Sequence, residues 1–189
     1  TIGLGWDMAD PVHKRGFLGA LFAAKPADYD LDAVALLLDT NNKIADLGPE
    51  KDLIAGDVVF FNSLKHPSGH IWMTGDNRTG AGTGDDEQII VKLNQLDAKY
   101  RRILFLVSIY EGQKTGQHFG QLKNAFIRAV DANGKVLCRY DISAESHYDN
   151  MCSIIFAEVV REVDGWQFKA LGTPQGDDSF VEILKKYLY

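Results

Sequence analysis

The sequence predicts an all-β protein, an antiparallel β-sandwich of two sheets with a C-terminal α-helix. Three features support this fold class: apolar segments of strand length recur along the chain, turn residues separate them, and few helical patterns lie between them. With 189 residues, 46% of them hydrophobic, the chain can bury a core. This length suits one domain over residues 1–189.

The first five expected strands are compact apolar runs. They are rich in Leu, Ile, Val and Phe, and Gly, Asp, Asn and Pro separate them. A run that is apolar at every position, such as ILFLV at 103–107, is typical of the centre of a sandwich, where both faces of the strand are covered. We expect these strands at 31–38, 58–61, 71–74, 89–93 and 103–110.

Two hairpins are expected in the second half of the chain. Asn133-Gly134 and Asp164-Gly165 are the turn pairs, and such pairs between apolar runs are strong hairpin signals. The flanking strands are expected at 125–130 with 136–140, and at 153–160 with 166–171.

One helix is expected, at the C-terminus. Ser179 and Glu182 have the spacing of a capping box. Apolar side chains then recur at helical spacing, which predicts that the helix packs against a sheet or across an edge of the sandwich. These side chains are Phe180, Ile183, Leu184, Tyr187 and Leu188.

The most unusual segment is 75–88, which reads GDNRTGAGTGDDEQ. Four acids stand there among four glycines, and a second acidic cluster, DYDLD, occupies 28–32. The two clusters hold seven acids and one base, and the rest of the chain has 19 acids and 19 bases within a net charge of −6. The acidic excess is therefore confined to two places, where the carboxylates repel one another unless a cation lies among them.

This segment has the chemistry of a calcium site. Carboxylate, amide, hydroxyl and backbone carbonyl oxygens are the ligands of Ca²⁺, and glycines let carbonyls approach an ion. Asp30 and Asp32 lie on one face of a strand by alternation, so both could converge with the loop on one or two cations. An EF-hand is excluded, because positions three, five and six of 76–87 carry Arg78, Gly80 and Ala81. A solvated, turn-rich acidic loop without an ion stays open as the alternative.

Six motifs, in order over nearly the whole chain, give this sequence a strong resemblance to the TerD family of tellurium-resistance and stress-response proteins. The glycine–acid loop is the most specific of them. The motifs are GLGWD (3–7), DLDA (30–33), TGDNRTGAGTGDDE (74–87), FGQLKNAFIRAVD (119–131), RYDIS (139–143) and WQFKALG (166–172).

The resemblance implies a β-sandwich that binds Ca²⁺, usually two ions, in the bacterial cytoplasm. It also implies an integral membrane protein of the TerC type and other Ter-family proteins as partners, and so a place at the inner face of the membrane. Asp7 could equally be an ordinary residue at a strand end. The cation ligands that the resemblance implies are Asp30, Asp32, Asp76, Asn77, Thr79, Asp85, Asp86 and Glu87, carbonyls near Gly80 and Gly82, and Asp7.

Two departures from the family pattern lead to further expectations. Family members usually carry a strand with Ser-Leu-x-Lys-Gly before GLGWD, and without it an edge of the sandwich is exposed or the chain is shortened. The segment 8–27 is longer than the family pattern and apolar in part. We expect it to contact a partner or to be covered by the C-terminal helix.

Other classes of function fit this sequence less well. The five histidines are scattered without paired metal spacing, and Ser63 and Ser68 lie in no nucleophile elbow, so we expect no catalysis. The acidic balance and the lack of a basic stripe argue against nucleic-acid binding. No apolar run approaches about 20 residues, the length that spans a bilayer.

Two features bear on compartment and on the alternative function. Cys138 and Cys152 have no metal-binding spacing, so we expect buried free thiols in a cytoplasmic protein. The alternative function is a calcium-dependent recognition module, either lectin-like or docking at a membrane like a C2 domain. Open coordination positions on the ion would distinguish such a module from a purely structural ion. The oligomeric state stays open.

Overall fold

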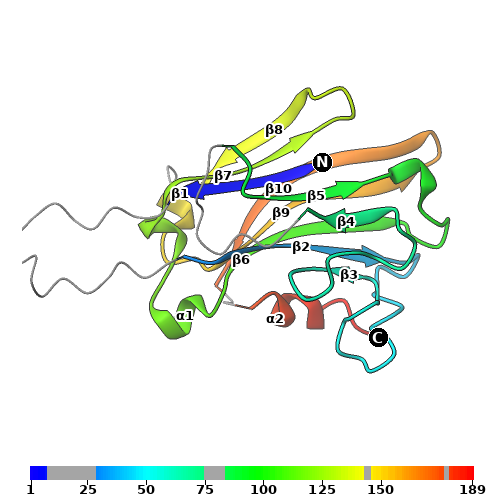
Figure 1. Cartoon of the computed structure of the whole chain (residues 1–189), viewed down its shortest axis with the longest axis horizontal. Helices are drawn as coiled ribbons and strands as arrows, with labels where there is room; N and C mark the ends of the chain where they lie inside the picture. Colours follow the sequence, from blue (N-terminus) through cyan, green and yellow to red (C-terminus); the bar gives the residue numbers. More distant parts are fainter. Residues whose placement is uncertain (8–28, 75–83, 143–145, 177–178) are drawn as a thin grey trace, which may run out of the picture.

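Two five-stranded antiparallel sheets pack face to face, as the sequence predicts (Figure 1). The computed structural model describes residues 1–7, 29–74, 84–142, 146–176 and 179–189. Sheet A has the strand order β4-β5-β1-β7-β8 and sheet B the order β10-β9-β6-β2-β3. The strands are β1 (Ile2–Asp7), β2 (Leu31–Leu38), β3 (Val58–Val59), β4 (Ile71–Met73), β5 (Glu87–Val91), β6 (Arg102–Ile109), β7 (Lys123–Val130), β8 (Val136–Asp141), β9 (Ser153–Glu162) and β10 (Gly165–Gln175).

The helices are short. The expected C-terminal helix is α2 (Phe180–Lys185), and Ser179 caps it, because its Oγ accepts a hydrogen bond from the Val181 N–H at 3.2 Å. A four-residue helix, α1 (Gly112–Thr115), was not expected. Single 3₁₀ turns occupy Leu93–Gln95, Phe119–Gln121 and Ser146–Tyr148. None of the helices in the described ranges is both long and apolar enough to cross a bilayer.

Apolar side chains form two layers, one on each face of sheet B. The layer between the sheets includes the fully buried Leu4, Phe105 and Phe156. The second layer lies on the outer face of sheet B, beside which α2 lies in Figure 1, and it combines apolar side chains of α2 with alternate residues of β2 and β6. Both faces of these two strands are therefore buried, which explains why their sequences are apolar at nearly every position.

The hairpins form as predicted, but several strand lengths differ from the prediction, most of all those of β3 and β10. Gly134 and Gly165 both have positive φ, at 82° and 127°, as their turns require. β3 covers only 58–59, because Phe60 turns back to bridge with Ser63. β10 continues four residues beyond 171, across an irregularity between 170 and 173 where Gly172 has φ 61°.

The first strand lies in the centre of its sheet. β1, which carries GLGWD, pairs with β5 on one side and β7 on the other, so the edges of sheet A are β4 and β8. β1 itself is therefore not an edge strand, and this placement does not test the expectation that a missing preceding strand leaves another edge exposed. The expectation for 8–27 lies outside the described residues.

Candidate functional site at the acidic end of the sandwich

The predicted ligands in the described ranges lie at one end of the sandwich. Asp7 ends β1, Asp30 and Asp32 lie at the start of β2, and 85–87 lead into β5, which runs antiparallel to β1. We call this region the acidic end. Five predicted ligands lie in 75–83, outside the described residues: Asp76, Asn77, Thr79, Gly80 and Gly82.

The side chain of Asp85 lies on the outer face of sheet A and is bound to an arginine. Gly3 pairs with Arg128 on β7, and because Gly3 has no side chain, the Asp85 carboxylate occupies the space above it. A Cβ on Gly3 would lie 2.3 Å from Asp85 Oδ2. Arg128 donates to both oxygens of Asp85, from Nε at 2.8 Å and from Nη2 at 3.0 Å, and Gln88 Nε2 donates to Oδ2 at 3.0 Å.

Asp86 points toward the end of β1. Its Oδ2 accepts a hydrogen bond from the Trp6 N–H at 2.9 Å. Burial, followed by the nearby charges of Asp7 and Asp85, raises the pKa of Asp86 above its usual value, although the Trp6 hydrogen bond acts in the opposite direction. Burial and the neighbouring carboxylates therefore disfavour the ionised form of Asp86.

Glu87 crosses from sheet A to sheet B. Its side chain is 1% exposed, and its Oε2 accepts the Ala33 N–H at 3.0 Å. This N–H lies on the side of β2 that faces β3, where the β2–β3 ladder pairs only Ala35 and Leu36 with the neighbouring strand. The Glu87 carboxylate thus accepts a hydrogen bond from the Ala33 N–H, which the β2–β3 ladder does not pair.

A second hydrogen bond joins the sheets nearby. The indole Nε1 of Trp6, in β1, donates to the carbonyl oxygen of Tyr29 at 3.1 Å. Tyr29 directly precedes Asp30, and Ala33 directly follows Asp32. The two acidic segments, 30–32 and 85–87, are therefore held beside each other by one hydrogen bond on each side of DLD.

Asp32 also lines a hollow on the outer face of sheet B. This hollow, which we call the Asp32 hollow, has a volume of about 490 Å³ and lies between β2, β6, the 52–62 segment and the start of α2. Asp32 is 4% exposed and pairs in register with Ser108, which is also buried and lines the same hollow. Asp52 and Glu111, neither of which the sequence singled out, add two further carboxylates to its lining, which contains no Lys or Arg.

The three consecutive acids 85–87 thus point in three directions. Within the described ranges, the His, Cys, Asp and Glu side chains form no group of three or more that could hold a metal ion. A calcium shell built from these residues would need oxygens from 75–83 as well.

A buried polar network around Asp57 was not predicted. Tyr100 Oη donates to Asp57 Oδ1 at 2.5 Å, and His66 Nε2 lies 3.2 Å from the same oxygen. On the other side of the imidazole, Ser68 Oγ lies 2.8 Å from His66 Nδ1. Asp57 Oδ2 accepts a hydrogen bond from the Asp46 N–H at 2.9 Å, so both oxygens of the buried carboxylate have hydrogen-bond partners.

The Ser68–His66–Asp57 order resembles that of a catalytic triad, but its hydrogen bonds belong to a turn. His66 Nδ1 also accepts the Ser68 N–H at 3.1 Å, and Ser68 Oγ accepts the His70 N–H at 3.2 Å. These short-range bonds close the turn at 66–70, and Asp57 and Tyr100 anchor it in the protein. Tyr100 lies 43 residues from Asp57 in the sequence, and a histidine before Pro-Ser-Gly was the local signal for the turn.

The fold and the acidic end define a class of protein, the two-sheet antiparallel β-sandwich with clustered carboxylates at one end. The chain belongs to the TerD domain family, whose profile matches residues 1–187, and this confirms the resemblance seen in the sequence. It is 52% identical over 192 residues to the tellurium resistance protein TerX of Serratia marcescens, covering 100% of this chain and 89% of that protein. It is 36% identical over 189 residues to the stress response protein SCP2 of Bacillus subtilis (strain 168), covering 99% and 88%.

A solved structure also has this fold. The crystal structure of SAV2460, a protein of unknown function, superimposes with a TM-score of 0.72 at 24% identity, covering 95% of this chain and 91% of that one. At this level of identity the similarity concerns the fold alone.

Proposed function

We propose that this protein binds calcium at the acidic end and acts in a tellurium-resistance or stress response through calcium-dependent interaction, without catalysis. The observation that carries the proposal is the pair of hydrogen bonds that flanks 30–32 and holds it beside 85–87, one from Trp6 to Tyr29 and one from Ala33 to Glu87, with Trp6 also bonded to Asp86. They keep the acidic segments together although 52 residues, 33–84, separate them in the sequence. The names of TerX and SCP2 support the cellular context.

The residues at this end suit a hard divalent cation. Asp30, Asp32, Asp86 and Glu87 would supply carboxylate oxygens from both sheets, which is the ligand type that Ca²⁺ prefers. Burial is the largest cause of the raised pKa of Asp86, and a cation bound at this place would favour its ionised form. We assign Asp85 a structural role instead, because Arg128 already neutralises it.

The test is calcium titration of the metal-stripped protein, followed by calorimetry and by thermal unfolding. At a free Ca²⁺ concentration about 100 times Kd, binding stabilises the folded state by about 2.7 kcal/mol. For a chain of this length that raises Tm by about 5 to 11 °C. Absence of both binding heat and a Tm change at millimolar Ca²⁺ would overturn the proposal.

Variants connect the response to these residues. Asp32→Asn and Asp86→Asn should each weaken calcium binding, because each loses one anionic ligand. Asp85→Asn should lower stability but keep the calcium response. The matched control is Asp164→Asn, in the turn between β9 and β10 at the opposite end of the sandwich.

The proposed partner is the one implied by the family resemblance, an integral membrane protein of the TerC type. Co-sedimentation with membranes that contain this protein should increase with Ca²⁺ and decrease with a chelator. The Asp32→Asn variant should lose the calcium dependence. Calcium binding without calcium-dependent association would leave the ion as a purely structural one and refute the interaction.

A further inference from the structure

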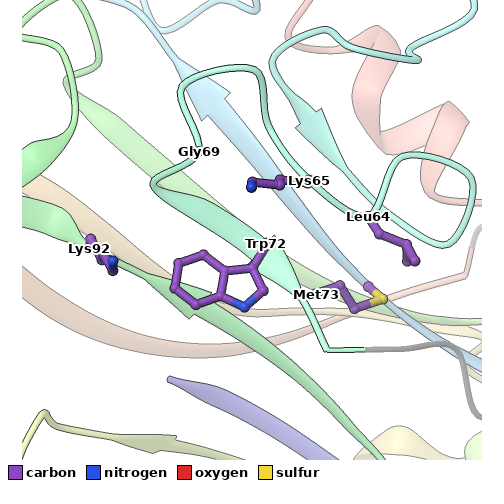
Figure 2. A pocket seen from close by; sticks show the side chains of 6 residues that line it. All are labelled: Leu64, Lys65, Gly69, Trp72, Met73 and Lys92. Carbon is purple, nitrogen blue, oxygen red and sulfur yellow. The ribbon is translucent and has the colours of Figure 1, made fainter.

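A hollow beside β4 has chemistry opposite to that of the acidic end. Six residues line it: Leu64, Lys65, Gly69, Trp72, Met73 and Lys92 (Figure 2). Its volume is about 330 Å³, at the small end of the range for ligand sites. We call it the Trp72 hollow. Lys92 follows β5 at the end opposite to Glu87, and five residues of extended chain separate them by about 17 Å.

Its lining combines an aromatic face with two positive charges. Lys65 and Lys92 are the charged residues of the lining, and no acid belongs to it. Lys92 Nζ lies 5.5 Å from the centre of the Trp72 ring, and Figure 2 shows the indole between Lys92 and Met73. In the described part of the chain neither lysine forms an ion pair. The whole protein has a net charge of −6, but this hollow is positively charged, so its charge is complementary to that of an anionic ligand.

The walls of the Trp72 hollow are held by backbone hydrogen bonds. The Met73 N–H donates to the Leu64 carbonyl at 2.7 Å, and Lys65 and Trp72 pair as an antiparallel bridge. The Lys92 N–H donates to the His70 carbonyl at 2.8 Å. The turn that carries Gly69 is fixed in addition by the buried network around Asp57. A ligand would therefore bind walls that are already in place, at little cost in conformational entropy.

We propose that the Trp72 hollow binds a small planar aromatic anion, that is, an aromatic ring carrying a phosphate or carboxylate group. The ring packs on the exposed part of the Trp72 indole, next to Leu64, which is 40% exposed. The anionic group is held by the ammonium groups of Lys65 and Lys92. This site is separate from the acidic end, and the proposal does not depend on calcium.

The test is titration of the ¹⁵N-labelled full chain with 1-naphthyl phosphate, observed through the indole N–H signals in NMR spectra. The Trp72 signal, assigned as the one lost in Trp72→Phe, should shift and saturate. The Trp6 signal should not move, since Trp6 is buried and its N–H is bound to Tyr29. Inorganic phosphate and neutral 1-naphthol should each bind at least tenfold more weakly than 1-naphthyl phosphate.

Charge variants test the two lysines. Lys65→Gln and Lys92→Gln should each weaken 1-naphthyl phosphate binding about threefold, and the double variant about tenfold, with the Gly69 amide as a second probe. Lys135→Gln, the same charge change in the β7–β8 turn, is the control and should bind as the wild type does. An unmoved Trp72 signal, equal affinity for 1-naphthol, or lysine-dependent binding only to phosphatidylglycerol vesicles would each overturn the proposal.

Discussion

The buried hydroxyl of Tyr100 gives the sharpest test of the packing described above. Tyr100→Phe keeps the ring and removes one hydrogen bond to the Asp57 carboxylate, while the donors from His66 and Asp46 stay. A hydrogen bond to a charged group contributes about 1.5 to 3 kcal/mol. With two donors left, we expect a loss of about 2 kcal/mol in the free energy of unfolding. In a chain of this length that lowers Tm by about 4 to 8 °C.

The loss should depend on pH with a definite sign. Burial alone would raise the pKa of Asp57, but the hydrogen bonds from His66 and Tyr100 outweigh burial and hold that pKa below its usual value. The stabilisation is therefore fully present above the unfolded-state pKa of about 3.9 and is lost as the pH falls through the folded-state pKa. The difference between wild type and Tyr100→Phe should accordingly be smaller at pH 2.5 than at pH 7, with the change confined to the range below about pH 4.

The assay is urea unfolding followed by tryptophan fluorescence at both pH values. Tyr110→Phe is the matched control, because Tyr110 is 49% exposed and should lose less than about 0.5 kcal/mol. An equal loss in the two variants, or a difference that grows on acidification, would refute the assignment of Tyr100 to a charged Asp57.

Three further predictions concern sheet A and its acidic end. Arg128→Met leaves the 2% exposed Asp85 side chain without its bidentate partner and should cost about 2 kcal/mol, measured by thermal unfolding; a neutral result would mean that Asp85 reaches water. Gly3→Ala places a methyl group 2.3 Å from Asp85 and should cost about 1 to 3 kcal/mol, whereas Gly176→Ala, with open space around its Cβ, is the control and should change little. Because the pKa of Asp86 is raised above its usual value, calcium binding should weaken as the pH falls toward that pKa and should release a proton only in that acidic range; calorimetry at several pH values in buffers of different ionisation enthalpy measures this, and an affinity that does not fall on acidification would exclude Asp86 as a ligand.

The sequence predicted the strands well because burial on a sheet leaves a local pattern. β2 and β6 are apolar at nearly every position since one face packs between the sheets and the other under α2. Asn133-Gly134 and Asp164-Gly165 located the hairpins through their turn chemistry. α1 was missed because four residues closed by left-handed Glu111 and Gly116 carry no helical periodicity.

The partners of the acids could not be predicted, because they depend on register between distant strands. Asp85 meets Arg128 only because the sheet sets Gly3 opposite that arginine. Glu87 binds Ala33 only because the two sheets face each other at this end. The sequence did predict that the two acidic clusters belong together, and it did so from charge balance and family resemblance.

The central place of β1 in sheet A has a consequence for folding. Residues 2–7 need β5 on one side and β7 on the other, so the strand cannot be fully paired until residue 130 is available. At a synthesis rate of about 5 to 20 residues per second, the first strand waits about 6 to 25 s for its second neighbour. If β1 were lost, sheet A would separate into the pairs β4–β5 and β7–β8, and isolated pairs of strands are marginally stable in water. β1 is thus synthesised long before its second neighbour, and this pairing between distant segments makes assembly of sheet A a slow, non-local event.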